Sequence, residues 1–178
     1  ILLMGLCQER FPEVFSGNMP NSDIRHIRLV FIRSAHCVAL HLKGVNLSMT
    51  EKQKDDIYYV CCLMEFIARK TKNHRQDVVR HFTKKDLERQ LRLAEVNHCL
   101  SFEQVSDELI EDYKIQDGMF DTVNECRYEV PSVTSIGMLY QELVLAIMPE
   151  EDAAQGIIDI FSSFITDEIS DFNSNVYY

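Results

Sequence analysis

TKKDLERQLRLAEVNHCLSFEQVSDELIEDY, residues 83–113, has the pattern of two amphipathic helices joined by a short corner. Thr83 stands three residues before Asp86, a spacing at which the two side chains can cap the start of a helix. Apolar residues then recur at intervals of three and four: Leu87, Leu91 and Ala94. This spacing predicts one buried helix face, and we expect the helix to end at Asn97, because Asn tolerates left-handed backbone.

The second helix of this stretch has an equally clear start. Ser101 stands three residues before Gln104, which is the spacing of a capping box. The apolar residues that follow again fall on one face: Phe102, Val105, Leu109 and Tyr113. We predict that this helix runs to residues 116–118 and ends with Gly118 in the left-handed conformation.

The composition limits the classes of protein that the chain can represent. It has 178 residues, 46% hydrophobic and 26% charged, which is ordinary for a folded soluble protein with one core. No run of about 20 apolar residues is present, so we predict no membrane span. The net charge of −10 argues against a nucleic-acid partner, because phosphates attract positive charge. Six cysteines lack framework spacing, and the adjacent Cys61 and Cys62 indicate reduced thiols in a cytoplasmic protein.

Residues 1–48 differ from the rest of the chain in charge. They hold five basic and three acidic residues, a net +2, which leaves −12 on the remaining 130 residues. One interpretation is a genuine leader with β-like segments between Ile27 and Leu42. The interpretation we favour is upstream sequence translated in frame, with the native protein beginning at Met49. It predicts a poorly structured leader.

After Met49 the apolar spacing is helical almost throughout. Ser48 and Glu51 have capping-box spacing at the start of a long helix, and Asn73 with Gln76 has the same spacing before a short one. Residues 118–131 have no clear period and are expected to form a connector.

Two further helices are expected toward the end of the chain. Pro131 with Ser132 or Thr134 opens the first, and the second runs from Ala154 to Ile169. The sum is an all-α fold, a compact bundle of about six short helices. We divide it into a helical domain at 49–130 and a C-terminal helical pair at 131–178 that the end of the chain truncates.

Charge is segregated along the central part of the sequence. Between Arg69 and Arg92 there are nine basic and three acidic residues. From Glu103 to Asp121 there are seven acidic residues and one basic residue, Lys114. Such patches can steer a basic protein partner, or pair with the opposite patch of a second copy. The candidate partner-binding residues are Glu103, Asp107, Glu108, Glu111, Asp112, Lys84, Lys85, Arg89 and Arg92.

A DNA-binding alternative uses the basic half of this set. Two short helices joined at Phe82 and Thr83 could form a helix-turn-helix that offers four cations to DNA: Lys84, Lys85, Arg89 and Arg92. The turn lacks glycine and the chain is acidic, so nucleic acid ranks below protein as a partner.

We find no catalytic, cofactor-binding or metal-binding constellation and expect a non-enzymatic protein without a cofactor. Neither Cys-x-x-Cys nor His-x-x-x-His occurs, and the six glycines form no phosphate-binding loop. No Ser or Cys stands in a glycine-flanked turn of the kind that holds a nucleophile. We expect His98, in the corner between the central helices, to bond to backbone carbonyls at a helix end. An enzyme whose site is completed beyond residue 178 remains as a third alternative.

Three motifs between residues 57 and 113 carry a family resemblance: Cys62-Leu-Met-Glu65, Val79–Phe82, and Leu93–His98 leading into Ser101–Leu109. They resemble a family of small bacterial helical domains of unknown function. The resemblance implies a likeness to partner proteins encoded beside toxin-like or effector genes, and so regulation by protein contact. The segregated charge, the absence of a catalytic constellation and this resemblance together lead us to expect a protein-interaction or regulatory module, antitoxin-like or an adaptor.

Overall fold

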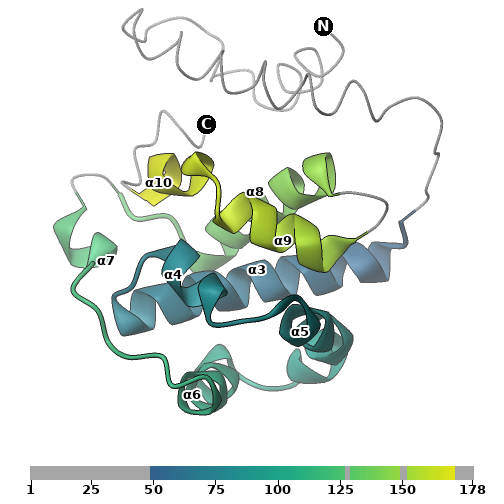
Figure 1. Ribbon diagram of the computed structural model, residues 1–178, viewed down its shortest axis with the longest axis horizontal. Coiled ribbons are helices and arrows are strands. Elements are labelled where there is room, and N and C mark those ends of the chain that lie inside the picture. The colour runs from purple at the N-terminus through teal and green to yellow at the C-terminus, as the bar shows by residue number, and fades with distance from the viewer. Residues whose placement is uncertain (1–48, 127–128, 149–151, 171–178) are drawn as a thin grey trace, which may run out of the picture. The chain divides into compact units, whose positions relative to one another are not determined.

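The computed structural model describes residues 49–126, 129–148 and 152–170, which lie within one compact unit, Ser48–Asn173 (Figure 1). These residues form helices and turns, with no strand among them, so the predicted all-α class is confirmed. The expected leader, residues 1–48, lies outside the described residues. The helices are α3 (Glu51–Thr71), α4 (Arg75–Arg80), α5 (Lys84–Asn97), α6 (Phe102–Asp112), α7 (Thr122–Glu125), α8 (Val133–Ile147), α9 (Ala153–Phe161) and α10 (Phe164–Ser170).

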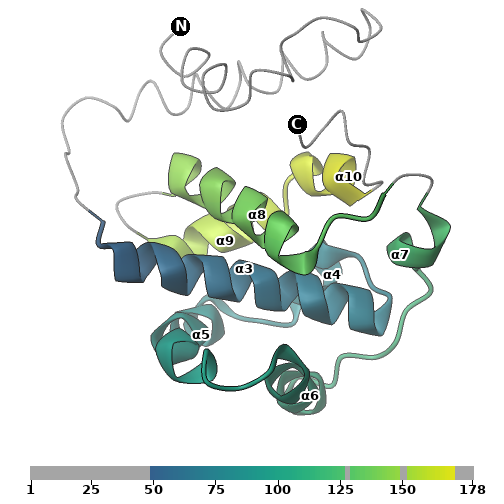
Figure 2. The same cartoon turned by 180° about the vertical axis from the view of Figure 1, so that it is seen from behind.

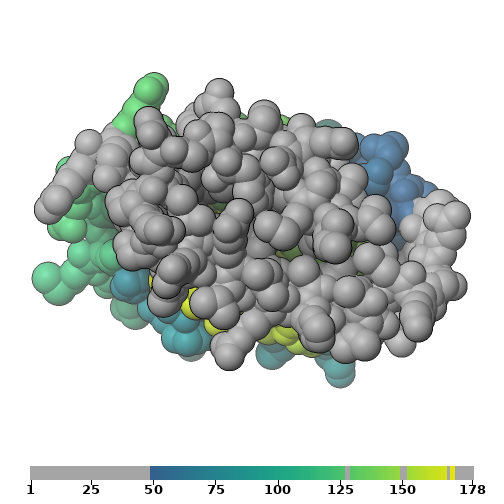
Figure 3. Space-filling model, turned by 90° about the horizontal axis from the view of Figure 1, so that it is seen from above, coloured from purple at the N-terminus to yellow at the C-terminus, as the bar shows by residue number. Residues whose placement is uncertain are grey.

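Helix α3 is the central element, and other helices pack on two of its sides (Figures 1 and 2). Helix α8 lies along one side, with α9 against it, whereas α5 and α6 lie on the other side. The first turns of α3 and the segment around α7 lie at opposite ends of the unit (Figure 3). Large apolar side chains of α3 are almost fully buried between these layers: Ile57, Leu63, Met64 and Ile67. Burying each contributes about 1.5–3 kcal/mol to stability.

The start of α3 lies two residues later than the predicted box of Ser48 and Glu51. Thr50 is the N-cap, and its hydroxyl accepts a hydrogen bond from the backbone N–H of Gln53 (3.2 Å). The Gln53 side chain in turn accepts from the backbone N–H of Thr50 (2.9 Å). The helix ends at Thr71, and its cap residue Lys72 is left-handed (φ 52°).

The two longest helices, α3 and α8, approach each other closely at Gly137 of α8. A Cβ atom there would overlap the Cys62 sulfur and would lie 3.0 Å from the Cys62 backbone nitrogen. Because glycine has no side chain, α8 can lie directly against α3 at this point. This contact fixes the part of the chain after residue 131 on the central helix.

The capping boxes predicted for the two central helices are confirmed. The Thr83 hydroxyl accepts from the Asp86 backbone N–H (3.3 Å), and the Asp86 carboxylate accepts from the Thr83 backbone N–H (2.8 Å). Ser101 and Gln104 make the same exchange at the start of α6. The predicted apolar faces supply the buried residues Leu87, Ala94, Val105 and Leu109.

The mechanism predicted for the ends of these helices is wrong. Helix α5 ends at Asn97 as expected, but its cap is the right-handed His98 (φ −58°). Helix α6 ends already at Asp112, and the left-handed residue after it is Lys114 (φ 54°). Gly118 is needed for a different reason, since a Cβ atom there would lie 2.5 Å from the Lys72 carbonyl oxygen.

The connectors also differ from the predictions. Helix α4 is capped by His74 and not by Asn73 with Gln76. The Asn73 amide instead donates to the Gln116 carbonyl (2.7 Å), so it holds the segment after α6 against the end of α3. A short helix, α7, forms where only a connector was expected.

The last predicted helix, residues 154–169, is interrupted and forms α9 and α10. The hydroxyls of Ser163 (2.7 Å) and Thr166 (3.1 Å) both donate to the Ile160 carbonyl. In a continuous helix that carbonyl would accept from the backbone N–H of residue 164. Competition from local side-chain donors therefore breaks the helix at this point. No helix in the described part of the chain is both long and apolar enough to cross a membrane.

Candidate protein-interaction surface on α5 and α6

Three of the predicted cations form a row on the outward face of α5. Lys85, Arg89 and Arg92 are exposed and follow at intervals of four and three residues, which places them on one side of the helix. We call this row the α5 basic stripe. Val96 continues the row after Arg92, and 64% of its surface is exposed. The opposite side of α5 packs into the core through Leu87 and its neighbours.

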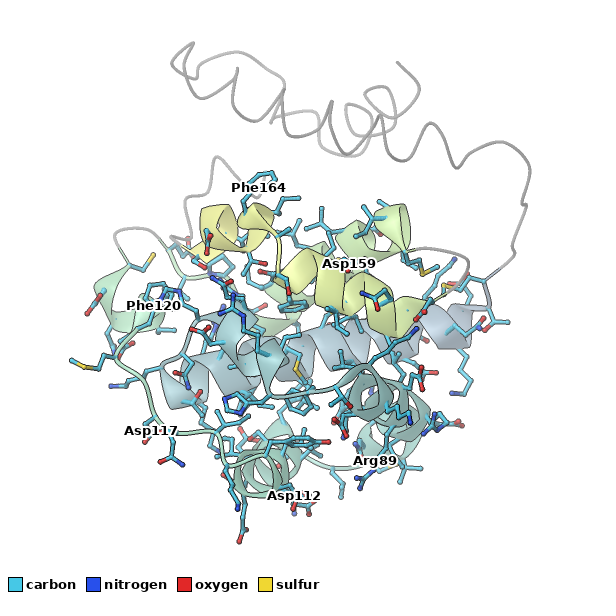
Figure 4. The ribbon with its side chains drawn as sticks, viewed as in Figure 1. Arg89, Asp112, Asp117, Phe120, Asp159 and Phe164 are labelled. Carbon is cyan, nitrogen blue, oxygen red and sulfur yellow. The ribbon has the colours of Figure 1, made fainter. Side chains whose placement is uncertain are left out.

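Four of the predicted acidic residues are exposed on α6. We call them the α6 acidic stripe: Glu103, Glu108, Glu111 and Asp112. Figure 4 shows Arg89 and Asp112 on the same outward side of the layer that α5 and α6 form below α3. The structure therefore brings the two predicted charge clusters together on neighbouring helices.

Two other predicted residues, Lys84 and Asp107, are used within the unit. The Lys84 ammonium pairs with Asp152 at the start of α9, and its hydrogen bond lowers the pKa of that carboxyl. Asp107 pairs with Lys70 of α3 (2.6 Å). These pairs hold α5 and α6 to the rest of the bundle, so neither side chain is as open to a partner as its neighbours.

Most lysines and arginines in the described residues have a carboxylate within ion-pair distance. Within that part of the chain, the cations without such a partner are Lys85, Arg89, Arg92 and Lys114. Three of these four make up the α5 basic stripe, and the fourth directly follows α6. The positive charge that remains for another molecule is therefore concentrated on this layer.

The end of α6 lies beside the start of α5, where Tyr113 packs on Phe82 with 4.3 Å between the ring centres. The Asp86 carboxylate accepts a hydrogen bond from the Thr83 hydroxyl (2.6 Å), which is the main cause of its lowered pKa, and the nearby Tyr113 hydroxyl lowers that pKa further. Burial and the nearby Asp86 raise the pKa of Tyr113, so this hydroxyl remains a donor. Arg89 and Asp112 both act on the Tyr113 hydroxyl electrostatically, which places both charges near this contact.

Charges at the start of α5 and at the end of α6 oppose the dipoles of their own helices, whereas Glu103 in the first turn of α6 is favourably placed. Lys84 and Lys85 occupy the first turn of α5, where the helix dipole is positive, and Glu111 and Asp112 occupy the last turn of α6, where it is negative. Charges in these places weaken a helix unless something outside it compensates them. Lys84 is compensated by Asp152, whereas the other three have no ion-pair partner in the described residues.

The corner between α5 and α6 adds apolar surface. Leu100 is 44% exposed and lies four residues after the exposed Val96.

His98 packs its ring against Tyr59, with 4.5 Å between the ring centres. The bond expected from His98 to a backbone carbonyl is not among the hydrogen bonds of the described residues. At this helix end it is the Tyr59 hydroxyl that donates a hydrogen bond to a backbone carbonyl, that of Asn97 (3.4 Å).

A buried ion pair lies apart from this surface, and sequence reasoning missed it. Glu65 of α3 is fully buried and accepts hydrogen bonds from Arg75 and from Arg69 (2.6 Å). Arg75 also donates to the Ser170 hydroxyl (2.9 Å), which joins α4 to α10. A signal was present, since Glu65 follows Cys61 by four residues within the apolar stripe of α3. The pair lies in the core, where its role is structural.

A shallow hollow of about 320 Å³ lies where the end of α3 meets the segment before α7. Phe120 stacks on His74, with 3.7 Å between the ring centres, and Met119 beside them is 95% exposed. The cation at its edge, Lys72, is paired with Asp121 (3.0 Å). The hollow therefore presents mainly apolar surface, and the charges of Lys72 and Asp121 are used in their own ion pair.

A metal-binding cluster or a reactive cysteine would supply reactive chemistry to the described residues. No group of three His, Cys, Asp or Glu side chains among them is placed to hold a metal ion. Burial raises the pKa of the Cys62 thiol to about 11 and that of Cys61 well above its ordinary value, so both are protonated and poorly nucleophilic. No family model, curated protein or solved structure matches the chain.

Proposed function

We propose that this chain is a non-enzymatic protein-interaction module, and that another protein docks on the outward face of α5 and α6. One observation carries the proposal: the unpaired cations of the described residues and four unpaired carboxylates lie together on this layer. Regulation by contact, as in an antitoxin-like or adaptor protein, fits such a surface.

The physical reason lies in what exposed charges do in association. Complementary patches speed the encounter of two proteins and fix their register, whereas like charges exclude wrong partners. The exposed Val96 and Leu100 at one end of the layer offer the apolar contact that affinity requires. Charge and apolar surface therefore occur together on α5 and α6.

A second candidate function is DNA binding through the same basic stripe. Three unpaired cations on a helix that follows a tight turn favour it. The pairing of Lys84 with Asp152 removes one predicted contact, and the neighbouring acidic stripe repels phosphates. We rank this candidate second. A shift of duplex DNA at low salt that disappears on adding salt would support it.

The test is affinity capture by the full chain from a lysate of the organism that encodes it. The acid-reversed variant carries Glu108→Lys, Glu111→Lys and Asp112→Lys. The matched control reverses three exposed acids elsewhere: Asp55→Lys, Glu129→Lys and Asp159→Lys. We expect a stoichiometric protein that is retained by the wild type and the control and lost from the acid-reversed variant. Retention by all three proteins would contradict the proposal.

A further inference from the structure

We propose that the partner on this surface is a second copy of the chain, with the α5 basic stripe of each copy on the α6 acidic stripe of the other. This inference rests on the proposed function, because it uses the same layer, and it adds the identity of the occupant. It also predicts the symmetry, a two-fold axis that runs parallel to α5 and α6 and passes between them.

The arrangement of the two helices determines which symmetry fits. The short corner at residues 98–101 joins the end of α5 to the start of α6, and Tyr113 after α6 packs on Phe82 before α5, with 4.3 Å between the ring centres. The two helices are therefore antiparallel, with the start of α5 beside the end of α6. A two-fold axis parallel to them exchanges α5 for α6 and keeps each position along the layer. Lys85 of one copy then faces the end of α6 in the other, near Asp112. An axis across the helices would instead set α5 on α5 and oppose like charges.

The charges of the stripes match under this symmetry. The α5 basic stripe carries three positive charges and the α6 acidic stripe carries four negative charges, all exposed and without an ion-pair partner in the described residues. A uniformly basic partner would be repelled by the first stripe, and a uniformly acidic one by the second. A second copy carries both signs of charge in the arrangement that the first copy requires. The two-fold symmetry then forms the contact between a basic and an acidic stripe twice.

The unfavourable placement of charge along each helix is compensated in the same complex. Lys85 at the start of α5 and Asp112 at the end of α6 each oppose the dipole of their own helix. In the dimer the start of each α5 lies beside the end of the other copy's α6, so opposite charges and opposite dipole ends meet. The exposed Val96 lies on the face of α5 that enters the contact, and Leu100 lies in the corner that crosses from α5 to α6.

The test measures the mass of the full chain in solution by light scattering at low salt. The base-reversed variant carries Lys85→Glu, Arg89→Glu and Arg92→Glu. We expect a dimer for the wild type and for the control with Asp55, Glu129 and Asp159 reversed. The base-reversed and acid-reversed variants each make the two stripes alike in sign, so each should have half the mass of the dimer. When these two variants are mixed, every stripe again meets its opposite, and the dimer mass should return.

Restoration on mixing also shows that both variants are folded, because unfolded chains would not recover a defined dimer. A wild type that is monomeric at low salt would overturn the inference. So would a dimer that survives in either variant, or a mixture that stays monomeric. The proposed function is judged separately: a monomeric wild type that still captures a different protein, and loses it on acid reversal, has a heterologous partner on the same surface.

Discussion

Arg75 binds Glu65 through two of its guanidinium nitrogens, inside the core and ten residues along the chain. The contact closes the turn between α3 and α4, because Glu65 lies on α3 and Arg75 begins α4. Only 3% of Arg75 and none of Glu65 is exposed to solvent. The pair therefore depends on its own geometry, since water cannot replace either partner.

Removing one member of this pair should destabilise the protein strongly. We expect Arg75→Met to lower the free energy of unfolding by about 3–5 kcal/mol, because it leaves a buried carboxylate with less compensation. Urea unfolding followed by circular dichroism measures the change. Arg80→Met, at an exposed position, is the control and should change stability by less than about 0.5 kcal/mol. The double variant Glu65→Leu/Arg75→Met should recover most of the loss. A single variant as stable as the control would show that the pair contributes little.

The capping box of Thr83 and Asp86 at the start of α5 predicts that the stability of the protein depends on pH. The Thr83 hydroxyl holds the pKa of Asp86 below its ordinary value of 3.8. A lowered folded-state pKa gives a stabilisation that is complete above 3.8 and is lost as pH falls through the folded value. We expect Thr83→Ala to cost about 1 kcal/mol at neutral pH. The difference from wild type should shrink on acidification below the ordinary pKa of Asp86. A difference that is constant with pH would contradict this origin.

The α3–α8 contact predicts a cost for the smallest added side chain. Alanine is normally the better helix former, but a Cβ atom at residue 137 would overlap the Cys62 sulfur. We expect Gly137→Ala to lower the free energy of unfolding by about 1–3 kcal/mol, as overpacking does. The double variant Gly137→Ala/Cys62→Ala removes the sulfur and should regain part of the loss. A single variant more stable than wild type would mean that the helices separate easily at this point.

Reversing the last acidic residues of α6 should strengthen the isolated chain while it weakens association. Glu111→Lys and Asp112→Lys place positive charge at the negative end of the helix dipole. Each should raise the free energy of unfolding by about 0.3–1 kcal/mol at low salt. Thermal unfolding at a dilution where the chain is monomeric measures this gain. A loss of stability in both variants would show that these acids serve the fold.

Helix starts could be predicted from the sequence because they depend on residues three positions apart. The boxes at Thr83 and Ser101 are of this kind. Helix ends could not be predicted in this way, because they depend on contacts between residues that are distant in sequence. Helix α6 stops where Tyr113 packs on Phe82, with 4.3 Å between the ring centres, and not at the glycine that follows. The break between α9 and α10 similarly depends on which hydroxyls reach the Ile160 carbonyl.

The candidate surface on α5 and α6 was also predictable in part, because local spacing in the sequence determines which residues of a helix are exposed. The α5 basic stripe follows from helical spacing alone, and the acids of α6 could be predicted as exposed because they lie off its apolar face. The sequence could not show that Lys84 is paired with Asp152, which lies 68 residues away, or that Asp107 is paired with Lys70. These pairs separate the charges that hold the bundle together from those that remain for a partner.

Docking on α5 and α6 is tested most sharply by amide hydrogen exchange on the full chain in its free and bound states. The bound state is either the concentrated chain at low salt or the chain with the protein that it captures. We expect binding to slow exchange in α5 and α6 and to leave α8 unchanged, because α8 lies on the other side of α3. Slower exchange in α8, with unchanged exchange in α5 and α6, would show that the partner does not dock on α5 and α6.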